Sequence, residues 1–129
     1  MSKPTISWQD APEEHNYPAA KSYLGLILDD AVAGKIAAKL QKCPLSHFKA
    51  KDIFRASGLS LLGVSNSHVL KDQRKVEAGK PLSPLLLVRD TELRKVIVAD
   101  GYHRLCAVYA HDEDALIPCQ IVSIPRRAG

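Results

Sequence analysis

A short polar cluster interrupts an apolar run near the C-terminal end of the chain. Asp100-Gly101-Tyr102-His103-Arg104 follows the strand-like stretch Val96–Ala99 and precedes Leu105, Val108 and Tyr109, which are spaced as on one face of a helix. The first turn of a helix has backbone N–H groups without intrahelical acceptors and carries a partial positive charge. A phosphate group is the natural ligand of such a position. The pattern therefore predicts an anion site at a strand-to-helix joint.

Each residue of the joint has a chemical reason to be there. Gly101 lets the backbone turn and approach an anion closely. His103 and Arg104 are cations where the helix dipole disfavours them unless an anion is bound, and both can donate to phosphate oxygens. Asp100 either caps the helix or holds a magnesium ion that bridges phosphates. The alternative stays open that Asp100 caps, Gly101 turns, and both cations are merely solvated.

These residues carry a family resemblance. The segments "PLSPLLLVRD" and "ADGYHRLCAVYAHDEDALIPCQIV" resemble the ParB/sulfiredoxin superfamily, and the similarity covers roughly residues 59–124, about half of the 129-residue chain. The resemblance implies a compact α/β fold in which the box Gly101-Tyr102-His103-Arg104 binds the phosphates of a nucleotide. ATP or CTP with magnesium is the implied ligand, and another phosphorylated small molecule is the broader expectation.

The resemblance also draws attention to the segment "SNSHVLKDQRKVEAG". It implies that His68, Lys71 and Lys75 bind phosphate, and their spacing places them on one helical face. A basic face opposite the joint would complete an anion cleft. The alternative is an ordinary solvated helix face, on which lysines need no special explanation.

Two departures from the family pattern narrow the function. Tyr102 occupies the position of the reactive cysteine of sulfiredoxin, and Cys106 lies one turn further on, where we expect it to face the core; reduction of cysteine sulfinic acid is therefore not expected. We also expect no ParB-type loading onto DNA, since the sequence shows neither a helix-turn-helix region after the box nor the paired arginines of the partitioning proteins.

Four functions are compatible with these residues. The first is nucleotide or phosphate binding by a stand-alone ParB-like domain, which leaves enzymatic activity undecided. The second is phosphoryl transfer, as in the free-serine kinases that resemble this superfamily, with Asp100 or, more weakly, Glu77 as base. The third is a small metal-dependent ParB-like nuclease that uses Asp100 and His103. The fourth is a protein-interaction module with a vestigial site, in which residues 19–42 form the contact surface.

Composition and charge restrict the partners and the compartment. The formal charge of +4 is spread along the chain, which suits an anionic ligand, and nucleic acid is possible but not favoured. Three cysteines without CxxC spacing indicate neither a disulfide framework nor a zinc site. With no signal-peptide pattern and no long apolar run, we expect a cytoplasmic protein without a membrane partner. The oligomeric state is left open.

The elements that must position the joint follow from turn and capping signals. We expect a flexible or loosely attached arm over residues 1–18 with Trp8 as its anchor, one domain over residues 19–125, and a tail over residues 126–129. Predicted helices span residues 19–42 with a break at Asp29-Asp30, then 50–56, 67–78 and 102–110; predicted strands span residues 84–90, 94–100 and 117–124. The sequence thus predicts a small mixed α/β domain with helices packed on a short sheet.

Overall fold

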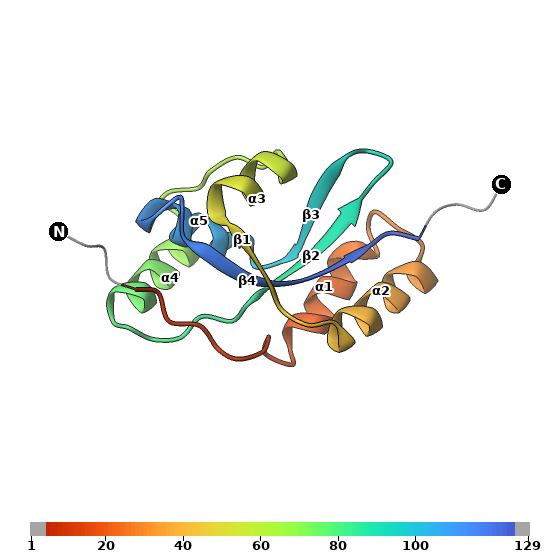
Figure 1. Ribbon diagram of the computed structural model, residues 1–129, viewed down its shortest axis with the longest axis horizontal. Coiled ribbons are helices and arrows are strands. Elements are labelled where there is room, and N and C mark those ends of the chain that lie inside the picture. The colour runs from red at the N-terminus through yellow and green to blue at the C-terminus, as the bar shows by residue number, and fades with distance from the viewer. Residues whose placement is uncertain (1–4, 126–129) are drawn as a thin grey trace.

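The structure is a computed structural model and describes residues 5–125 (Figure 1). Its helices are α1 (Asn16–Leu24), α2 (Asp30–Lys42), α3 (Ala50–Ser57), α4 (Ser67–Glu77) and α5 (Tyr102–His111). Its strands are β1 (Ser46–Lys49), β2 (Leu85–Asp90), β3 (Lys95–Asp100) and β4 (Leu116–Ser123). The predicted tail, residues 126–129, and the first four residues of the predicted arm lie outside the described part of the chain.

The four strands form one mixed sheet in the order β1-β4-β2-β3. β2 and β3 are an antiparallel hairpin, β2 and β4 run parallel, and β1 pairs antiparallel with β4 at the opposite edge. The parallel pair requires a crossover, and α5 lies in the connection from β3 to β4. The predicted fold class, a small α/β domain with helices packed on a mixed sheet, is confirmed.

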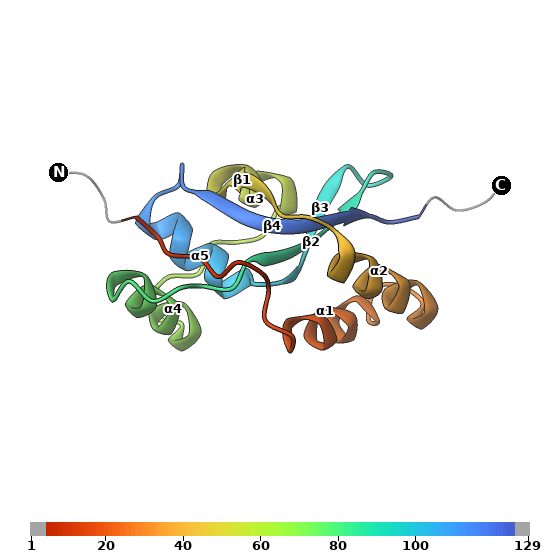
Figure 2. The ribbon, with the colours of Figure 1, turned by 60° about the horizontal axis from the view of Figure 1, so that its bottom comes forward.

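The central strand β2 is buried on both faces. Its consecutive residues Leu85 to Val88 alternate between two cores, because successive side chains of a strand point to opposite faces. Leu86 and Val88 pack with α1 and α2, while Leu85 and Leu87 pack with α3 and α5. Figure 2 shows α1 and α2 below the sheet and α3 above it. A continuous apolar run is the sequence pattern that such a strand needs.

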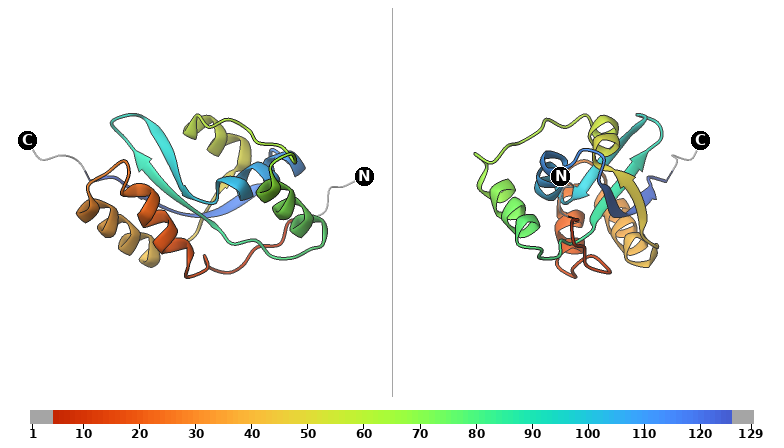
Figure 3. Two further views of the ribbon diagram at one scale, coloured as in Figure 1. Left: turned by 180° about the vertical axis from the view of Figure 1, so that it is seen from behind. Right: turned by 60° about the vertical axis from the view of Figure 1, so that its left-hand side comes forward.

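Helices α4 and α5 pack side by side at one end of the molecule, beyond the edge of the α1–α2 layer (Figures 1 and 3). Val69 of α4 and Cys106 and Ala107 of α5 are fully buried at this contact. Burial raises the pKa of the Cys106 thiol, and the expectation that this cysteine faces the core is confirmed. The contact brings the first turn of α5 beside the first turns of α4.

The N-terminal segment is attached more closely than a loose arm. Trp8 forms a parallel bridge with Leu82, and the backbone hydrogen bonds Gln9 N to Leu82 O and Leu82 N to Ser7 O join the two segments. Trp8 packs against the core, as expected of an anchor. Figure 3 shows this segment running alongside the connection from α4 to β2. A pairing across more than 70 positions is invisible to local sequence signals.

Three features of the N-terminal half differ from the prediction: the start of α1, its end at Leu24 before the expected break at Asp29-Asp30, and the strand β1. α1 begins at Asn16, before the expected start at Ala19, because Pro18 lies in the first turn, where its missing N–H costs no helical hydrogen bond. The strand β1 was not predicted at all. It has only four residues, two of them exposed, and it exists because β4 offers an antiparallel partner.

Within residues 5–125, no helix has the length and apolar character needed to cross a membrane.

Candidate functional site

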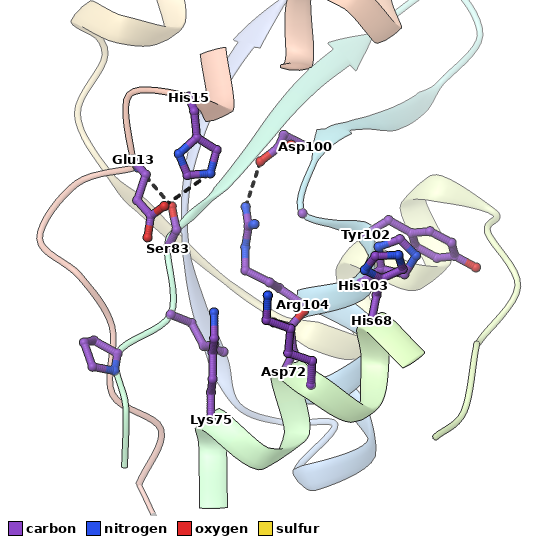
Figure 4. A pocket seen from close by; sticks show the side chains of 14 residues that line it. Glu13, His15, His68, Asp72, Lys75, Ser83, Asp100, Tyr102, His103 and Arg104 are labelled. Atoms are coloured by element: carbon purple, nitrogen blue, oxygen red, sulfur yellow. Dashed lines mark hydrogen bonds and ion pairs between the residues drawn. The ribbon is translucent and has the colours of Figure 1, made fainter. Parts of the chain in front are cut away.

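A cavity of about 260 Å³ lies where α4, the first turn of α5, the β3 end and the N-terminal segment meet (Figure 4). All of the residues predicted to bind phosphate or magnesium line it: His68, Lys71, Lys75, Asp100, Gly101, Tyr102, His103 and Arg104. The structure therefore gathers the predicted joint and the predicted basic helix face around one space. Their roles there remain predictions.

Gly101 makes the turn from β3 into α5. Its φ of 110° is a conformation that residues with a side chain rarely adopt. A Cβ at this position would lie 2.8 Å from Leu85 Cγ and 2.9 Å from Arg104 Nη2. The glycine is thus required twice, once by the backbone angle and once by the side chains that cross it.

Asp100 does not cap the helix. The N-cap residue is Gly101, and Asp100 Oδ2 instead accepts a hydrogen bond of 2.9 Å from Arg104 Nη2. The two side chains are mostly buried, with exposed fractions of 17% for arginine and 19% for aspartate. Of the two roles considered for Asp100, capping is wrong. A role in binding magnesium would have to compete with this ion pair.

The first turn of α5 is open to a ligand in two respects. No side chain of the described chain caps it, whereas α4 is capped by Asn66 Oδ1, which accepts from His68 N at 2.9 Å and from Val69 N at 3.3 Å. In addition, Arg104 Nε is buried and has no hydrogen-bond acceptor among residues 5–125. A buried donor without a partner is costly, and an anion in the cavity would offer it one.

The cavity face of α4 carries both signs of charge. Lys71 and Lys75 line it, as predicted, and so does Asp72, which was not predicted. Burial raises the pKa of the Asp72 carboxyl, opposed by the nearby charges of Arg104 and Lys75. Asp72 thus places a carboxyl on the helix face that the sequence analysis read as basic.

The aromatic residues of the joint, Tyr102 and His103, lie with their ring centroids 5.7 Å apart but make different further contacts. The His103 ring lies against that of His68, with centroids 4.8 Å apart and planes inclined by 32°. The Tyr102 hydroxyl donates instead to the carbonyl of Ser60, in the connection between α3 and α4. Figure 4 shows the tyrosine pointing away from Arg104. Tyr102 thus borders the cavity and ties the first turn of α5 to the connection between α3 and α4.

The N-terminal segment supplies residues that the sequence analysis missed. Glu13 and His15 line the cavity and lie 3.2 Å apart, from Oε2 to Nε2. The Glu13 amide donates to Ser83 Oγ at 3.1 Å, and Gln9 Nε2 donates to Glu13 Oε1 at 2.8 Å. This bond from Gln9 lowers the pKa of Glu13, aided by His15 and opposed by burial. The sequence feature that could have pointed to these residues is the run "EEH", two acids and a histidine between two prolines.

The cavity is electrostatically mixed. Among its lining residues, Lys71, Lys75 and Arg104 are balanced in formal number by Glu13, Asp72 and Asp100, and three histidines add charge only when protonated. Within the described residues, no group of three or more histidine, cysteine, aspartate or glutamate side chains is placed to hold a metal ion. Glu77, the weaker candidate base, does not line the cavity.

No protein-family model, curated protein or solved structure matches this chain. The resemblance to the ParB/sulfiredoxin superfamily therefore stays a prediction from the sequence motifs.

Proposed function

We propose that this chain is a ParB-like domain that binds a nucleotide or another phosphate-bearing ligand at the Asp100–Arg104 joint. The observation that carries the proposal is the meeting, around one cavity, of Lys71, Lys75, the first turn of α5 and Arg104; among residues 5–125, that turn has no side-chain cap and the buried Nε of Arg104 has no hydrogen-bond partner. Backbone amides and a guanidinium together are well suited to phosphate oxygens. The resemblance of the box to phosphate-binding members supports the same conclusion.

The size of the cavity favours the phosphate end of the ligand as the enclosed part. At about 260 Å³, it lies below the usual range of roughly 300–1,000 Å³ for sites that enclose a whole drug-sized molecule. A phosphate and the few atoms next to it would be enclosed. The remainder of a nucleotide would extend over the rim, where the described residues give no selection for one base.

Calorimetry and amide NMR test this proposal. ATP, CTP, inorganic phosphate and a small phosphate monoester are titrated, with and without magnesium, into wild type and Arg104→Ala. We expect binding that perturbs the amide signals of Gly101, Tyr102 and His103, and a loss of about tenfold or more in affinity for Arg104→Ala. Lys39→Gln, on the exposed face of α2, is the matched control for charge. Absence of binding by all four ligands would refute the proposal.

Phosphoryl transfer is the second candidate, because an ionisable carboxylate other than the predicted ones borders the cavity. Asp100 is engaged by Arg104 and Glu77 does not line the cavity, but Asp72 does, and its raised pKa suits a general base better than an ordinary aspartate does. In this reaction, the base accepts the proton of a substrate hydroxyl, the hydroxyl oxygen bonds to the γ-phosphorus of ATP, and ADP leaves. Labelled ATP and small hydroxylated metabolites test it, with Asp72→Asn inactive and Glu77→Gln active.

The remaining alternatives gain nothing specific. The nuclease alternative needs a metal held near Asp100 and His103, and Asp100 is already ion-paired. The interaction alternative assigned residues 19–42 to a contact surface; much of the apolar face of α1 and α2 is buried against the sheet, and of the large apolar side chains in this segment Tyr23, Leu26 and Ile27 are exposed.

A further inference from the structure

The two histidines of the cavity meet at the starts of two different helices. His68 is the second residue of α4 and His103 the second residue of α5, and their rings lie in contact at 4.8 Å between centroids. Figure 4 shows the two imidazoles overlapping at the edge of the cavity. A positive charge on either ring would face the positive end of its own helix dipole and the other imidazole. This arrangement disfavours a proton on His103 when the cavity holds no anion.

The surrounding charges do not remove this penalty. The charged and titratable residues that line the same cavity are Lys71, Asp72 and Lys75 from α4, Arg104 from α5, Asp100 from the end of β3, and Glu13 and His15 from the N-terminal segment. Burial, followed by the charge of His68, lowers the pKa of His103, with Asp72 opposing and Arg104 adding to the effect. Two carboxylates of the cavity could stabilise a positive charge on His103, but neither is free to do so fully. Asp100 is paired with Arg104, and Asp72 is partly desolvated.

We propose that His103, held against His68, forms a proton-linked clamp: a dianionic phosphate head binds in the cavity together with a proton taken up by the His103 ring. The inference rests on the proposed phosphate site and specifies its ligand and its regulation. A dianion such as the head of a phosphate monoester compensates a protonated imidazole as well as the nearby lysines. The monoanionic phosphodiester of a nucleic-acid backbone does so less well and is the disfavoured ligand.

The coupling has a defined sign. A bound dianion stabilises the protonated His103 ring, so binding raises the pKa of His103 from its lowered value. By linkage, affinity for the anion then increases as pH falls through the interval between the free and bound pKa values of this group, which begins below the ordinary value of 6.5 in the free protein. Above the bound pKa, the affinity stops depending on this proton.

Sulfate is the probe of choice, because it stays dianionic across the relevant pH range and carries no titrating proton of its own. Calorimetric titrations at pH 5.5, 6.5 and 8.0 are run in two buffers of different ionisation enthalpy, which counts the protons taken up on binding. We expect affinity about tenfold higher at pH 5.5 than at pH 8.0, with net proton uptake near pH 6. Dimethyl phosphate, a monoanion with the same tetrahedral shape, is expected to bind more weakly with a smaller pH dependence.

Variants separate the pair from other titrating groups. His103→Gln should reduce the pH dependence to about twofold or less, whereas His15→Gln and Asp72→Asn should retain it. The Asp72 variant matters because protonation of its carboxyl would also strengthen anion binding at low pH. His47→Gln, exposed on β1 and away from the cavity, is the matched control. The Cε1–H resonance of His103, followed with and without sulfate, reports its pKa directly.

The outcomes distinguish this inference from the proposed function. Sulfate or phosphate binding that is independent of pH, or whose pH dependence survives His103→Gln, overturns the clamp and leaves a phosphate site. Loss of the dependence in Asp72→Asn also overturns it and assigns the proton to the carboxyl. No binding at any pH refutes both. Proton uptake that disappears in His103→Gln supports the clamp.

Discussion

The Arg104 side chain folds back over the first turn of α5 and donates from Nη2 to Asp100 Oδ2 at 2.9 Å, directly past Gly101. The guanidinium therefore occupies the space that a side chain at position 101 would take. The pair is four residues apart but spans the strand-to-helix joint, so it fixes the arginine against the end of β3. The positions of the three residues depend on one another: the arginine can reach the aspartate only because Gly101, which lies between them, has no side chain.

Gly101→Ala should destabilise the protein by more than its backbone angle explains. A Cβ would contact the buried side chain of Leu85 and displace the Arg104 guanidinium. We expect a loss of at least about 2 kcal/mol in the free energy of unfolding, measured in urea. Gly58→Ala is the matched control, because Gly58 has a φ of 68° but nothing within 4 Å of a Cβ.

Gly58→Ala should lower the free energy of unfolding by about 1 kcal/mol, which is the effect of a positive φ alone. Equal losses in the two variants would mean that the neighbours of Gly101 adjust freely, and would contradict the close packing of the joint. The difference between them measures the contacts around Gly101.

Asp100→Asn distinguishes a positioning acid from a metal ligand. The asparagine carbonyl can still accept from Arg104, but the negative charge is lost. If Asp100 only positions the arginine, sulfate affinity should rise by a few-fold, because the guanidinium is no longer neutralised. Calorimetry measures the affinity, and titrations of ATP with and without magnesium are run on both proteins. An affinity for ATP that loses its magnesium dependence only in the variant would instead assign the metal to Asp100.

Asn66→Ala tests whether the cap of α4 holds the basic face in place. Asn66 Oδ1 accepts from the amides of His68 and Val69, and its loss should cost about 1 kcal/mol in urea unfolding. Asn66→Ser, which keeps a capping oxygen, is expected to lose much less. Because His68 lies in the capped turn, the alanine variant should also weaken sulfate binding. An unchanged free energy of unfolding in the alanine variant would show that the cap contributes little.

Local signals predicted the ends of α3, α4 and α5 and the joint well. The caps at Asn66 and Gly58 are fixed by residues within three positions, as is the turn at Gly101. The hairpin of β2 and β3 was equally readable, since its strands are adjacent and joined by a short turn. The prediction that the basic face of α4 lies opposite the joint came from the family resemblance. The spacing of residues alone does not say which helix packs beside α5.

Long-range pairing was beyond the sequence patterns. β1 depends on β4, some 70 residues away, and the N-terminal segment depends on its bridge to Leu82. Glu13 reaches the cavity only through that pairing, so its role was missed together with the segment. The two roles proposed for Asp100 came from its type, and neither anticipated that the arginine four residues later would turn back to it.

The lowered pKa of His103 gives a pH dependence of stability in the absence of anions. The unfolded chain takes up a proton at this residue near pH 6.5, before the folded protein does, because burial and the neighbouring His68 disfavour the charge. The contribution of this residue is therefore present above the unfolded pKa and is lost as pH falls through the folded pKa. Urea unfolding in chloride buffers should show stability decreasing from pH 7.5 to pH 5.5, with a shallower decrease in His103→Gln.

Sulfate should reverse the loss of stability that His103 causes at low pH. A dianion that raises the pKa of His103 in the folded state makes the folded protein the stronger proton acceptor, so stability at pH 5.5 should recover more than stability at pH 7.5. The raised pKa of Asp72 has the opposite effect on stability, because the folded protein then takes up a proton at this carboxyl more readily than the unfolded chain does. This effect sets in at lower pH than that of His103, since the ordinary pKa of an aspartate is 3.8. Equal stabilisation by sulfate at both pH values, in wild type and His103→Gln alike, would show that the anion and the proton bind independently.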